Sequence, residues 1–266
     1  MPMKGPEIDF LCRHLKTVVD LVITLLLWSY FIIGFIIFFA PFYLAAYLLS
    51  GDRQRSFQRL NHLFYQGFFR LVRILVPRTR WRIQADIRKL RSAIIVCNHI
   101  SYLDSILLIS LFEKQTTIVK NTFFNVPVFG QVIEASGYIP STSGGKLADL
   151  MIQRVEEMDQ YLTSGGNLLI FPEGTRSRDG RIGRLNKGAF KIARRCRKPI
   201  VVLSIRNTDR LFQPGRSLFN TCSDNTITLE VLTTIEPAAQ GENFSISDVM
   251  SRVRSILETQ TAKESP

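Results

Sequence analysis

Residues 98–104, with the sequence Asn-His-Ile-Ser-Tyr-Leu-Asp, lie between two apolar runs of different character. The run before them, 93–97, reads Ala-Ile-Ile-Val-Cys and is typical of a short buried strand. The run after them, 106–111, is rich in Leu and Ile and predicts a helix. We therefore expect a strand-to-helix turn, which is where α/β folds carry their binding and catalytic side chains.

The turn contains an imidazole and a carboxylate at a fixed spacing. His99 is one of only 3 histidines in the chain, and Asp104 follows it five positions later. A neutral imidazole can accept a proton near neutral pH, because its unperturbed pKa is about 6.5. A carboxylate on the other ring nitrogen would fix the tautomer and stabilise the imidazolium. The pair predicts a general base with an orienting acid.

The same residues allow a structural interpretation. Ser101 and Asp104 fit a helix capping box, with the serine at the N-cap and the aspartate as the third helical residue. In that case His99 would be a structural histidine rather than a catalytic one. The two interpretations are compatible, because such a cap would also place Asp104 near the turn that holds His99.

A second polar stretch, 171–177, reads Phe-Pro-Glu-Gly-Thr-Arg-Ser and follows the apolar run 167–170. Its arginine, Arg176, is the side chain best suited to bidentate binding of phosphate or carboxylate. The stretch therefore indicates an anion site at another strand end. Proline and glycine in this order also simply form a turn, which is the structural alternative.

Together, the histidine turn and the second stretch resemble the two main motifs of the glycerolipid acyltransferases, the lysophosphatidate acyltransferases in particular. The resemblance covers about 93–202, with weaker landmarks at 126–130 and 198–200. It implies that His99 is the base and that Asp104 orients and polarises it. The residues that it implies for binding of the acceptor are Glu173, Gly174, Thr175, Arg176 and, more weakly, Lys120.

One landmark departs from the family pattern. The segment 137–143 stands where the family has a run that ends in an arginine, and Ser143 occupies the place of that arginine. In the family this arginine helps to bind the phosphate of the acceptor. The head group of the acceptor is therefore left open.

The resemblance implies an enzyme that moves a fatty acyl group from a thioester to the free hydroxyl of lysophosphatidate, giving phosphatidate in phospholipid synthesis. The donor would be acyl-CoA or acyl carrier protein. The alternatives are a different acceptor, such as a lyso-ornithine lipid or another lysophospholipid, and a non-catalytic membrane-binding protein. We expect no cofactor, because the thioester is already activated, and no metal, because one histidine is in reach of the turn.

An uncharged segment of 31 residues, 21–51, precedes these motifs. A membrane-spanning helix needs about 20 apolar residues, and the run is too long for a cleavable signal peptide. A straight helix of this length would measure about 46 Å, against a hydrocarbon core of ~30 Å. Gly34 and Pro41 are the expected breaks. The segment is either one tilted span or a hairpin embedded in one leaflet, and the resemblance favours the hairpin.

The formal net charge is +12, and basic residues dominate the region after the apolar segment. Positive charge beside such a segment indicates the cytoplasmic face of a membrane, the inner membrane in a bacterium. Residues 53–76 fit an amphipathic helix lying on anionic lipid, with an ordinary packed helix as the alternative. Nucleic acid would also attract the basic run 176–198, but the apolar segment favours membrane lipid as the partner and no nucleic acid.

Strands alternate with helices, which predicts an α/β fold with a mostly parallel mixed sheet flanked by helices. Residues 1–80 would form the membrane-association segment, with hydrophobic 21–51 and basic amphipathic 53–76, and residues 81–262 the acyltransferase domain. The 4 cysteines are widely separated, which suits a reducing compartment. We expect strands at 81–87, 93–97, 116–120, 137–140, 167–171, 200–205 and 226–234, and helices at 127–135, 146–162, 187–198 and 246–257.

Overall fold

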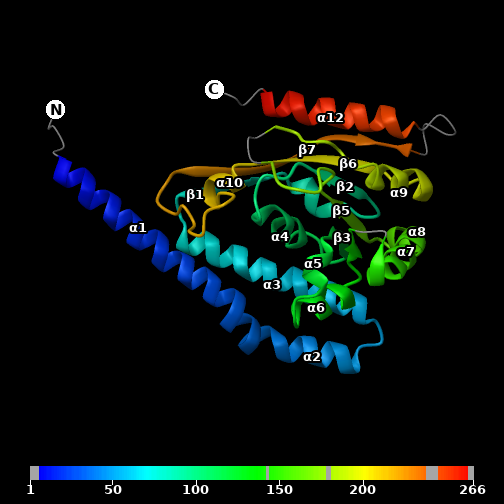
Figure 1. Ribbon diagram of the computed structural model, residues 1–266, viewed down its shortest axis with the longest axis horizontal. Helices are drawn as coiled ribbons and strands as arrows, with labels where there is room; N and C mark the ends of the chain where they lie inside the picture. Colours follow the sequence, from blue (N-terminus) through cyan, green and yellow to red (C-terminus); the bar gives the residue numbers. More distant parts are fainter. Residues whose placement is uncertain (1–5, 142–143, 178–180, 238–244, 263–266) are drawn as a thin grey trace.

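The computed structural model describes residues 6–141, 144–177, 181–237 and 245–262. Its centre is a 7-stranded sheet in the order β1-β7-β6-β2-β5-β3-β4, covered by helices on both faces (Figure 1). All neighbouring strands are parallel except β6 and β7. The predicted mixed, mostly parallel sheet is confirmed. The strands are β1 (Thr79–Ile83), β2 (Ile94–Cys97), β3 (Gln115–Val119), β4 (Ile139–Pro140), β5 (Asn167–Ile170), β6 (Ile200–Arg206) and β7 (Asn225–Ile235).

The helices precede the sheet, connect its strands and close the chain. A π-helical segment, η1 (Tyr30–Phe39), and two short 3-10 turns, η2 (Ala85–Lys89) and η3 (Gly145–Leu147), complete the described elements. The α-helices are α1 (Pro6–Ser29), α2 (Ala40–Leu49), α3 (Arg53–Leu75), α4 (Leu103–Ile109), α5 (Asn121–Phe124), α6 (Phe129–Ala135), α7 (Ala148–Glu156), α8 (Met158–Thr163), α9 (Gly188–Cys196), α10 (Thr208–Leu211) and α12 (Ile246–Ala262).

The central strand β2 is apolar on both faces, and its side chains alternate between two cores. Ile95 and Cys97 join the core beneath α3 and α4, whereas Ile94 and Val96 join the core beneath α8, α9 and α12. This alternation follows from the period of two along a strand. A strand covered on both sides needs a continuous apolar run, which explains the sequence before the histidine turn.

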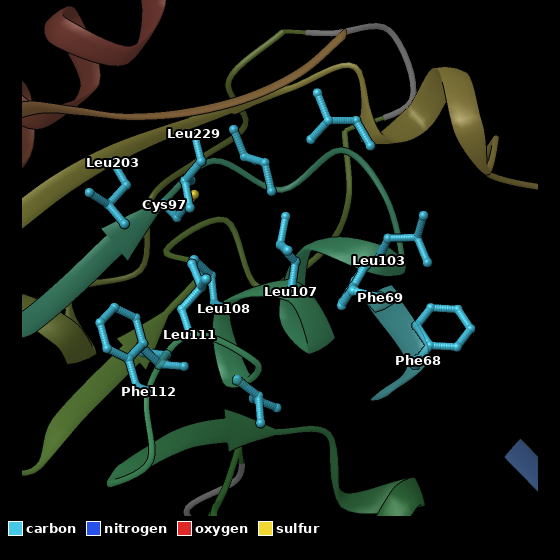
Figure 2. Close-up of a cluster of buried hydrophobic side chains, with 14 of the residues drawn as sticks. Phe68, Phe69, Cys97, Leu103, Leu107, Leu108, Leu111, Phe112, Leu203 and Leu229 are labelled. Carbon is cyan, nitrogen blue, oxygen red and sulfur yellow. The ribbon is translucent and has the colours of Figure 1, made fainter. Parts of the chain in front are cut away.

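The first core holds the α3 side of the sheet together (Figure 2). Phe68 and Phe69 of α3 and Leu108 of α4 are almost completely buried in it. Burial of a large apolar side chain contributes about 1.5–3 kcal/mol, so α3 is part of the core of the α/β fold. The apolar face of α3 therefore packs against protein, and the arginines Arg53, Arg55, Arg59, Arg70 and Arg73 remain on its exposed side.

The N-terminal helical run is continuous from α1 through η1 to α2. Its part from Arg13 to Leu49 is long and apolar enough to cross a membrane, and it exposes large apolar side chains such as Ile36 and Phe42. The chain does not reverse at Gly34 or Pro41. It reverses at 50–52, where Asp52 caps the start of α3 by accepting a hydrogen bond from the backbone N–H of Arg55. The chain thus forms no hairpin within 21–51. It bends between α1 and α2, where η1 contains Gly34 and Pro41 lies at the start of α2, and α3 then runs in the opposite direction (Figure 1).

A polar contact fixes this helix to the sheet domain. The buried carboxylate of Asp20 accepts hydrogen bonds from the backbone N–H and the hydroxyl of Thr221, at 2.8 and 2.6 Å. One turn later, the hydroxyl of Thr24 accepts a hydrogen bond of 2.9 Å from the backbone N–H of Phe219. The loop before β7 is therefore joined to α1 at two successive turns.

Several expected elements differ in their bounds, such as the last helix, which runs to Ala262 rather than 257, and the strand expected over 137–140, which is limited to Ile139–Pro140. The first strand begins and ends earlier than 81–87, because η2 takes up the end of that range. The helix expected over 146–162 is divided into α7 and α8 around Glu157. It ends as expected before Gly165, whose positive φ of 89° suits the left-handed position after a helix.

Candidate active site

The two motifs meet at the carboxyl edge of the sheet. β2 and β5 are parallel neighbours, with Val96 opposite Ile170, so the segments that follow them leave the sheet side by side. The ring of His99 stacks on the ring of Phe171, with 4.2 Å between the centroids. The backbone N–H of Ser177 donates a hydrogen bond of 2.8 Å to the carbonyl of His99. The second motif thus supports both the ring and the backbone of the histidine.

His99 and Asp104 form a direct pair. The distance from Nδ1 of the imidazole to Oδ2 of the carboxylate is 2.9 Å. The histidine side chain is 15% exposed, whereas the aspartate side chain is fully buried. A carboxylate on Nδ1 selects the tautomer that carries its proton there and leaves Nε2 as the proton acceptor. The arrangement can therefore supply an oriented base.

Asp104 is held by more than the histidine. Its Oδ2 also accepts hydrogen bonds of 2.7 Å from the backbone N–H groups of Ile100 and Ser101. Its Oδ1 accepts a hydrogen bond from the hydroxyl of Thr208, at 2.5 Å. Buried charges need such partners, because an unsatisfied one is costly. The carboxylate is thus fixed from both sides of the turn.

The capping interpretation is realised only in part. Asp104 reaches back to the N–H of Ser101, which is one half of a capping box. The hydroxyl of Ser101 instead donates to the carbonyl of Phe212 at 3.0 Å, and it accepts from the N–H of Leu103 at 3.3 Å. The aspartate therefore stabilises the helix start and contacts His99 with the same oxygen.

Asn98 and Thr208 are two site residues that the sequence did not single out for a role. Asn98 exchanges two hydrogen bonds with the backbone of Ile205, at 2.8 and 2.9 Å, and so extends the pairing of β2 with β6 by its side chain. Thr208 begins α10 directly after β6. A polar residue after the end of a neighbouring parallel strand is the signal that could have found Thr208.

Glu173 links the two motifs. Its Oε1 accepts a hydrogen bond of 3.2 Å from the backbone N–H of His99, and its Oε2 accepts one of 2.8 Å from Gly183. The residue is only 8% exposed, and burial raises the pKa of its carboxyl group, against the lowering effect of these two hydrogen bonds. This geometry is that of a brace, because both carboxylate oxygens are occupied by backbone groups.

The turn after Glu173 depends on a glycine. Gly174 has a φ of 67°, and a Cβ there would lie 2.9 Å from Nδ2 of Asn186. Both the positive φ and the close amide favour glycine. Gly174 and Thr175 are exposed beside the histidine turn, and the backbone N–H of Gly174 donates to the carbonyl of Phe171 at 3.0 Å.

Arg176 lies over the ring of Tyr102, with its guanidinium carbon 3.2 Å from the ring centroid. Its buried Nη1 has no hydrogen-bond partner among the described residues. An arginine with a free donor, flattened against an aromatic ring, is suited to accept a bidentate anion. The structure therefore brings the cation of the second motif to the turn of the first.

Lys120 and Ser143 stand apart from this arrangement. Lys120 is exposed at the carboxyl end of β3, next to β5, and none of the hydrogen bonds described for the chain joins it to the histidine turn. Ser143 lies outside the described residues. Among those that are described, no three His, Cys, Asp or Glu side chains gather as a metal site would require.

Comparison with known proteins defines the class of this domain. Residues 78–206 match the family model described as Acyltransferase. This range contains both motifs and six of the strands in full, so the part of the chain that carries the candidate site is similar to the Acyltransferase family. Its named relatives are 1-acyl-sn-glycerol-3-phosphate acyltransferases.

The extent of these similarities differs between relatives. The chloroplastic enzyme BAT2 of Brassica napus is 33% identical over 120 residues, which are 45% of this chain and 34% of that protein. The enzyme of Salmonella typhimurium is 23% identical over 203 residues, 75% of this chain and 79% of that protein. This chain thus spans about a third of the length of the Brassica relative.

A solved structure shares the fold. The crystal structure of PlsC, the lysophosphatidate acyltransferase of Thermotoga maritima, superposes with a TM-score of 0.70 at 21% sequence identity. The similarity covers 93% of this chain and 97% of that one, so it includes the N-terminal helices as well as the sheet.

Proposed function

We propose that this protein transfers a fatty acyl group from an acyl thioester to the free hydroxyl of lysophosphatidate, giving phosphatidate. The observation that carries the proposal is the pairing of His99 Nδ1 with the buried Asp104 at 2.9 Å, beside the available guanidinium of Arg176. The family of the domain and the names of its relatives support it.

The reaction needs one base and no covalent enzyme intermediate. His99 Nε2 removes the proton of the acceptor hydroxyl as its oxygen attacks the thioester carbonyl. Asp104 holds the ring and stabilises the imidazolium that forms. The carbon–sulfur bond then breaks, and the imidazolium returns the proton to the leaving thiolate. The products are the ester and a free thiol.

The acceptor is held by its charged end. Arg176 is half-buried and would bind the phosphate through its guanidinium, together with the exposed residues Gly174 and Thr175. Lys120 is a secondary contributor, because it follows the carboxyl end of β3, the strand that pairs with β5. Glu173 positions this motif rather than the ligand, since its oxygens bind the backbone.

The membrane supplies the acceptor. The run from Arg13 to Leu49 would anchor residues 1–80 in the bilayer, with the domain from 81 onward on the cytoplasmic face, where the arginines of α3 meet anionic lipid. The donor would be acyl-CoA or acyl carrier protein, both of which are water-soluble and would reach the site from the aqueous side.

The test is to measure the rate of acyl transfer by the purified protein in detergent. His99→Ala should lower turnover at least about 10²-fold, as loss of a general base does, while the melting temperature stays within the wild-type range. A folded variant that keeps a near-normal rate would show that His99 is not the base.

The acceptor is tested with a panel of lysolipids and labelled acyl-CoA. We expect lysophosphatidate to be used, Arg176→Ala to raise its KM sharply, and Ser143→Arg to change it little, because Arg176 or a lysine already meets the phosphate. Preference for a zwitterionic lysolipid, with lysophosphatidate use restored by Ser143→Arg, would assign a different acceptor. Absence of all acyl transfer would favour the non-catalytic membrane protein.

A further inference from the structure

A basic cavity of about 440 Å³ lies away from the histidine turn, between the segment before α9 and the first turns of α12. In Figure 1, α9 and α12 lie on the side of the sheet opposite α1, α2 and α3. The cavity therefore lies on the side of the sheet opposite the apolar helix. Its lining residues are Arg184, Leu185, Asn186, Lys187, Ser247, Met250, Ser251 and Arg254.

The lining is cationic and rich in hydrogen-bond donors. The side chains of Arg184 and Lys187 are exposed on one wall. Arg254, on the other wall, is held by Glu258 at 2.7 Å and by the carbonyl of Ile182 at 3.4 Å. No acidic side chain is among the lining residues described for the cavity. Two serine hydroxyls and one amide complete a surface that suits a ligand with several anionic oxygens.

The wall from α12 is ordered by helix geometry. Ser247, Met250, Ser251 and Arg254 are spaced as one face of a helix, so they project together toward the segment 184–187. Val253 and Leu257 of the same helix are buried in the second core. The cavity is thus formed by packed elements rather than by a loop alone.

One short segment joins this cavity to the candidate active site. The backbone N–H of Gly183 donates to Glu173 at 2.8 Å, and the backbone N–H of Asn186 donates to the carbonyl of Pro172 at 2.7 Å. Glu173 in turn contacts the backbone of His99. The wall of the cavity and the support of the histidine turn are therefore parts of one hydrogen-bonded unit.

We propose that this cavity binds the phosphate groups at the nucleotide end of an acyl-CoA donor. The inference rests on the proposed acyl transfer and names the donor and its binding site. Coenzyme A carries its phosphates at one end of a long arm and the thioester at the other. An anionic lipid head group would arrive from the side of the apolar helix, whereas the elements that line the cavity lie on the opposite side of the sheet, which favours a water-soluble donor.

Binding is measured first, without turnover. Coenzyme A is titrated into full-length protein in detergent by calorimetry, with pantetheine, which lacks phosphate, as the comparison ligand. Arg254→Gln should weaken coenzyme A binding about tenfold, as loss of one charge-assisted contact does. Arg252→Gln, on the exposed side of the same helix, is the matched control and should bind as the wild type does. Equal binding by the two variants would overturn the proposal.

A kinetic comparison then locates the effect. Arg254→Gln and the double variant Arg184→Gln with Lys187→Gln should raise the KM for acyl-CoA and leave the rate with acyl-pantetheine unchanged. A similar loss with both donors would mean that the substitutions disturb the active site instead, and the proposal would fail.

The inference and the proposed function can fail separately. His99→Ala should abolish acyl transfer and still bind coenzyme A as the wild type does. If the wild type binds coenzyme A at this cavity but acylates no lysolipid, the site stands and the proposed function falls. If the wild type acylates lysophosphatidate only from acyl carrier protein and does not bind coenzyme A, the site falls and the function stands.

Discussion

The hydroxyl of Thr208 donates a hydrogen bond of 2.5 Å to Oδ1 of Asp104, the carboxylate oxygen that does not contact His99. Thr208 is completely buried, and it reaches the turn from the start of α10, which follows β6, the neighbour of β2 on the side opposite β5. Thr208 thus helps to fix Asp104, the residue that orients His99, although the two lie 104 positions apart in the sequence.

Thr208→Val should weaken this support with almost no change in side-chain volume. A buried carboxylate oxygen left without its donor costs about 1–3 kcal/mol, so we expect a lower melting temperature together with a reduced kcat. Thr208→Ser keeps the hydroxyl and should recover most of both. The measurements are thermal unfolding and acyl-transfer kinetics on the same preparations, and a valine variant with normal kcat would limit Thr208 to a structural role.

Asp104→Asn separates the two contacts of this side chain. The amide oxygen of asparagine can still accept from the backbone of Ile100 and Ser101, so folding should change little. The neutral amide cannot stabilise an imidazolium on His99, so turnover should fall at least about 10²-fold. Kinetics and melting temperature, measured on the same preparation, distinguish support of His99 from support of the helix start. Little loss of rate would assign Asp104 to the helix start alone.

The contribution of Glu173 to stability should depend on pH. Burial raises the pKa of its carboxyl group above the ordinary value of 4.5. The folded state therefore binds this proton more tightly than the unfolded state does, and the resulting stability is present below about 4.5 and is lost as the pH rises through the folded-state pKa. The unfolding free energy of the wild type minus that of Glu173→Gln should therefore fall from low to neutral pH. A rise of this difference with pH would contradict the raised pKa.

Tyr102 is expected to position Arg176 for the acceptor. Stacking of a guanidinium on a ring is worth about 0.5–2 kcal/mol, so Tyr102→Leu should raise the KM for lysophosphatidate about two- to thirtyfold at nearly constant kcat. Tyr102→Phe keeps the ring and should behave as the wild type does. An equal rise in KM for a zwitterionic lysolipid would show that the ring acts on the lipid chain and not through the arginine.

The outward face of the N-terminal helix should control membrane retention. Ile32 and Ile36 are each 61% exposed, so replacing both with lysine should leave the packing against α3 intact. Charged groups are costly in hydrocarbon, and the variant should become extractable from membranes by carbonate where the wild type requires detergent. Removal of 1–50 is a poorer test, because it would uncover Phe64 and Phe68 of α3.

The parts of this fold that were predictable are those encoded by local pattern. The apolar run before Asn98 is buried on both faces and forms the central strand, and the strand-to-helix turn places His99 and Asp104 together within seven residues. Asn98 and Thr208 were beyond such reasoning. Asn98 pairs with Ile205 of β6, and Thr208, which follows β6, pairs with Asp104. Each pair is more than a hundred residues apart in the sequence, and strand order is not written in local periodicity.

The helix α3 shows a different limit. An apolar stripe opposite a basic one is the same pattern whether the stripe faces lipid or protein. The choice depends on Phe68, Phe69 and Val72 fitting against β1, β2 and α4, which only the assembled structure supplies. The continuous path through Gly34 and Pro41 likewise depends on the aromatic contacts of Tyr30 and Phe31 with α3.

The join between α1 and the loop before β7 has a mechanical consequence. Thr24 holds Phe219, Phe219 stacks on Phe212 at 4.5 Å, and the carbonyl of Phe212 receives the hydroxyl of Ser101 in the histidine turn. This series of contacts connects the apolar helix to the reacting groups without an intervening flexible segment. If the helix lies in a bilayer as proposed, its tilt in a thinner or thicker membrane would carry the turn with it. The bilayer would then help to set the depth at which His99 meets the lipid hydroxyl of the proposed reaction.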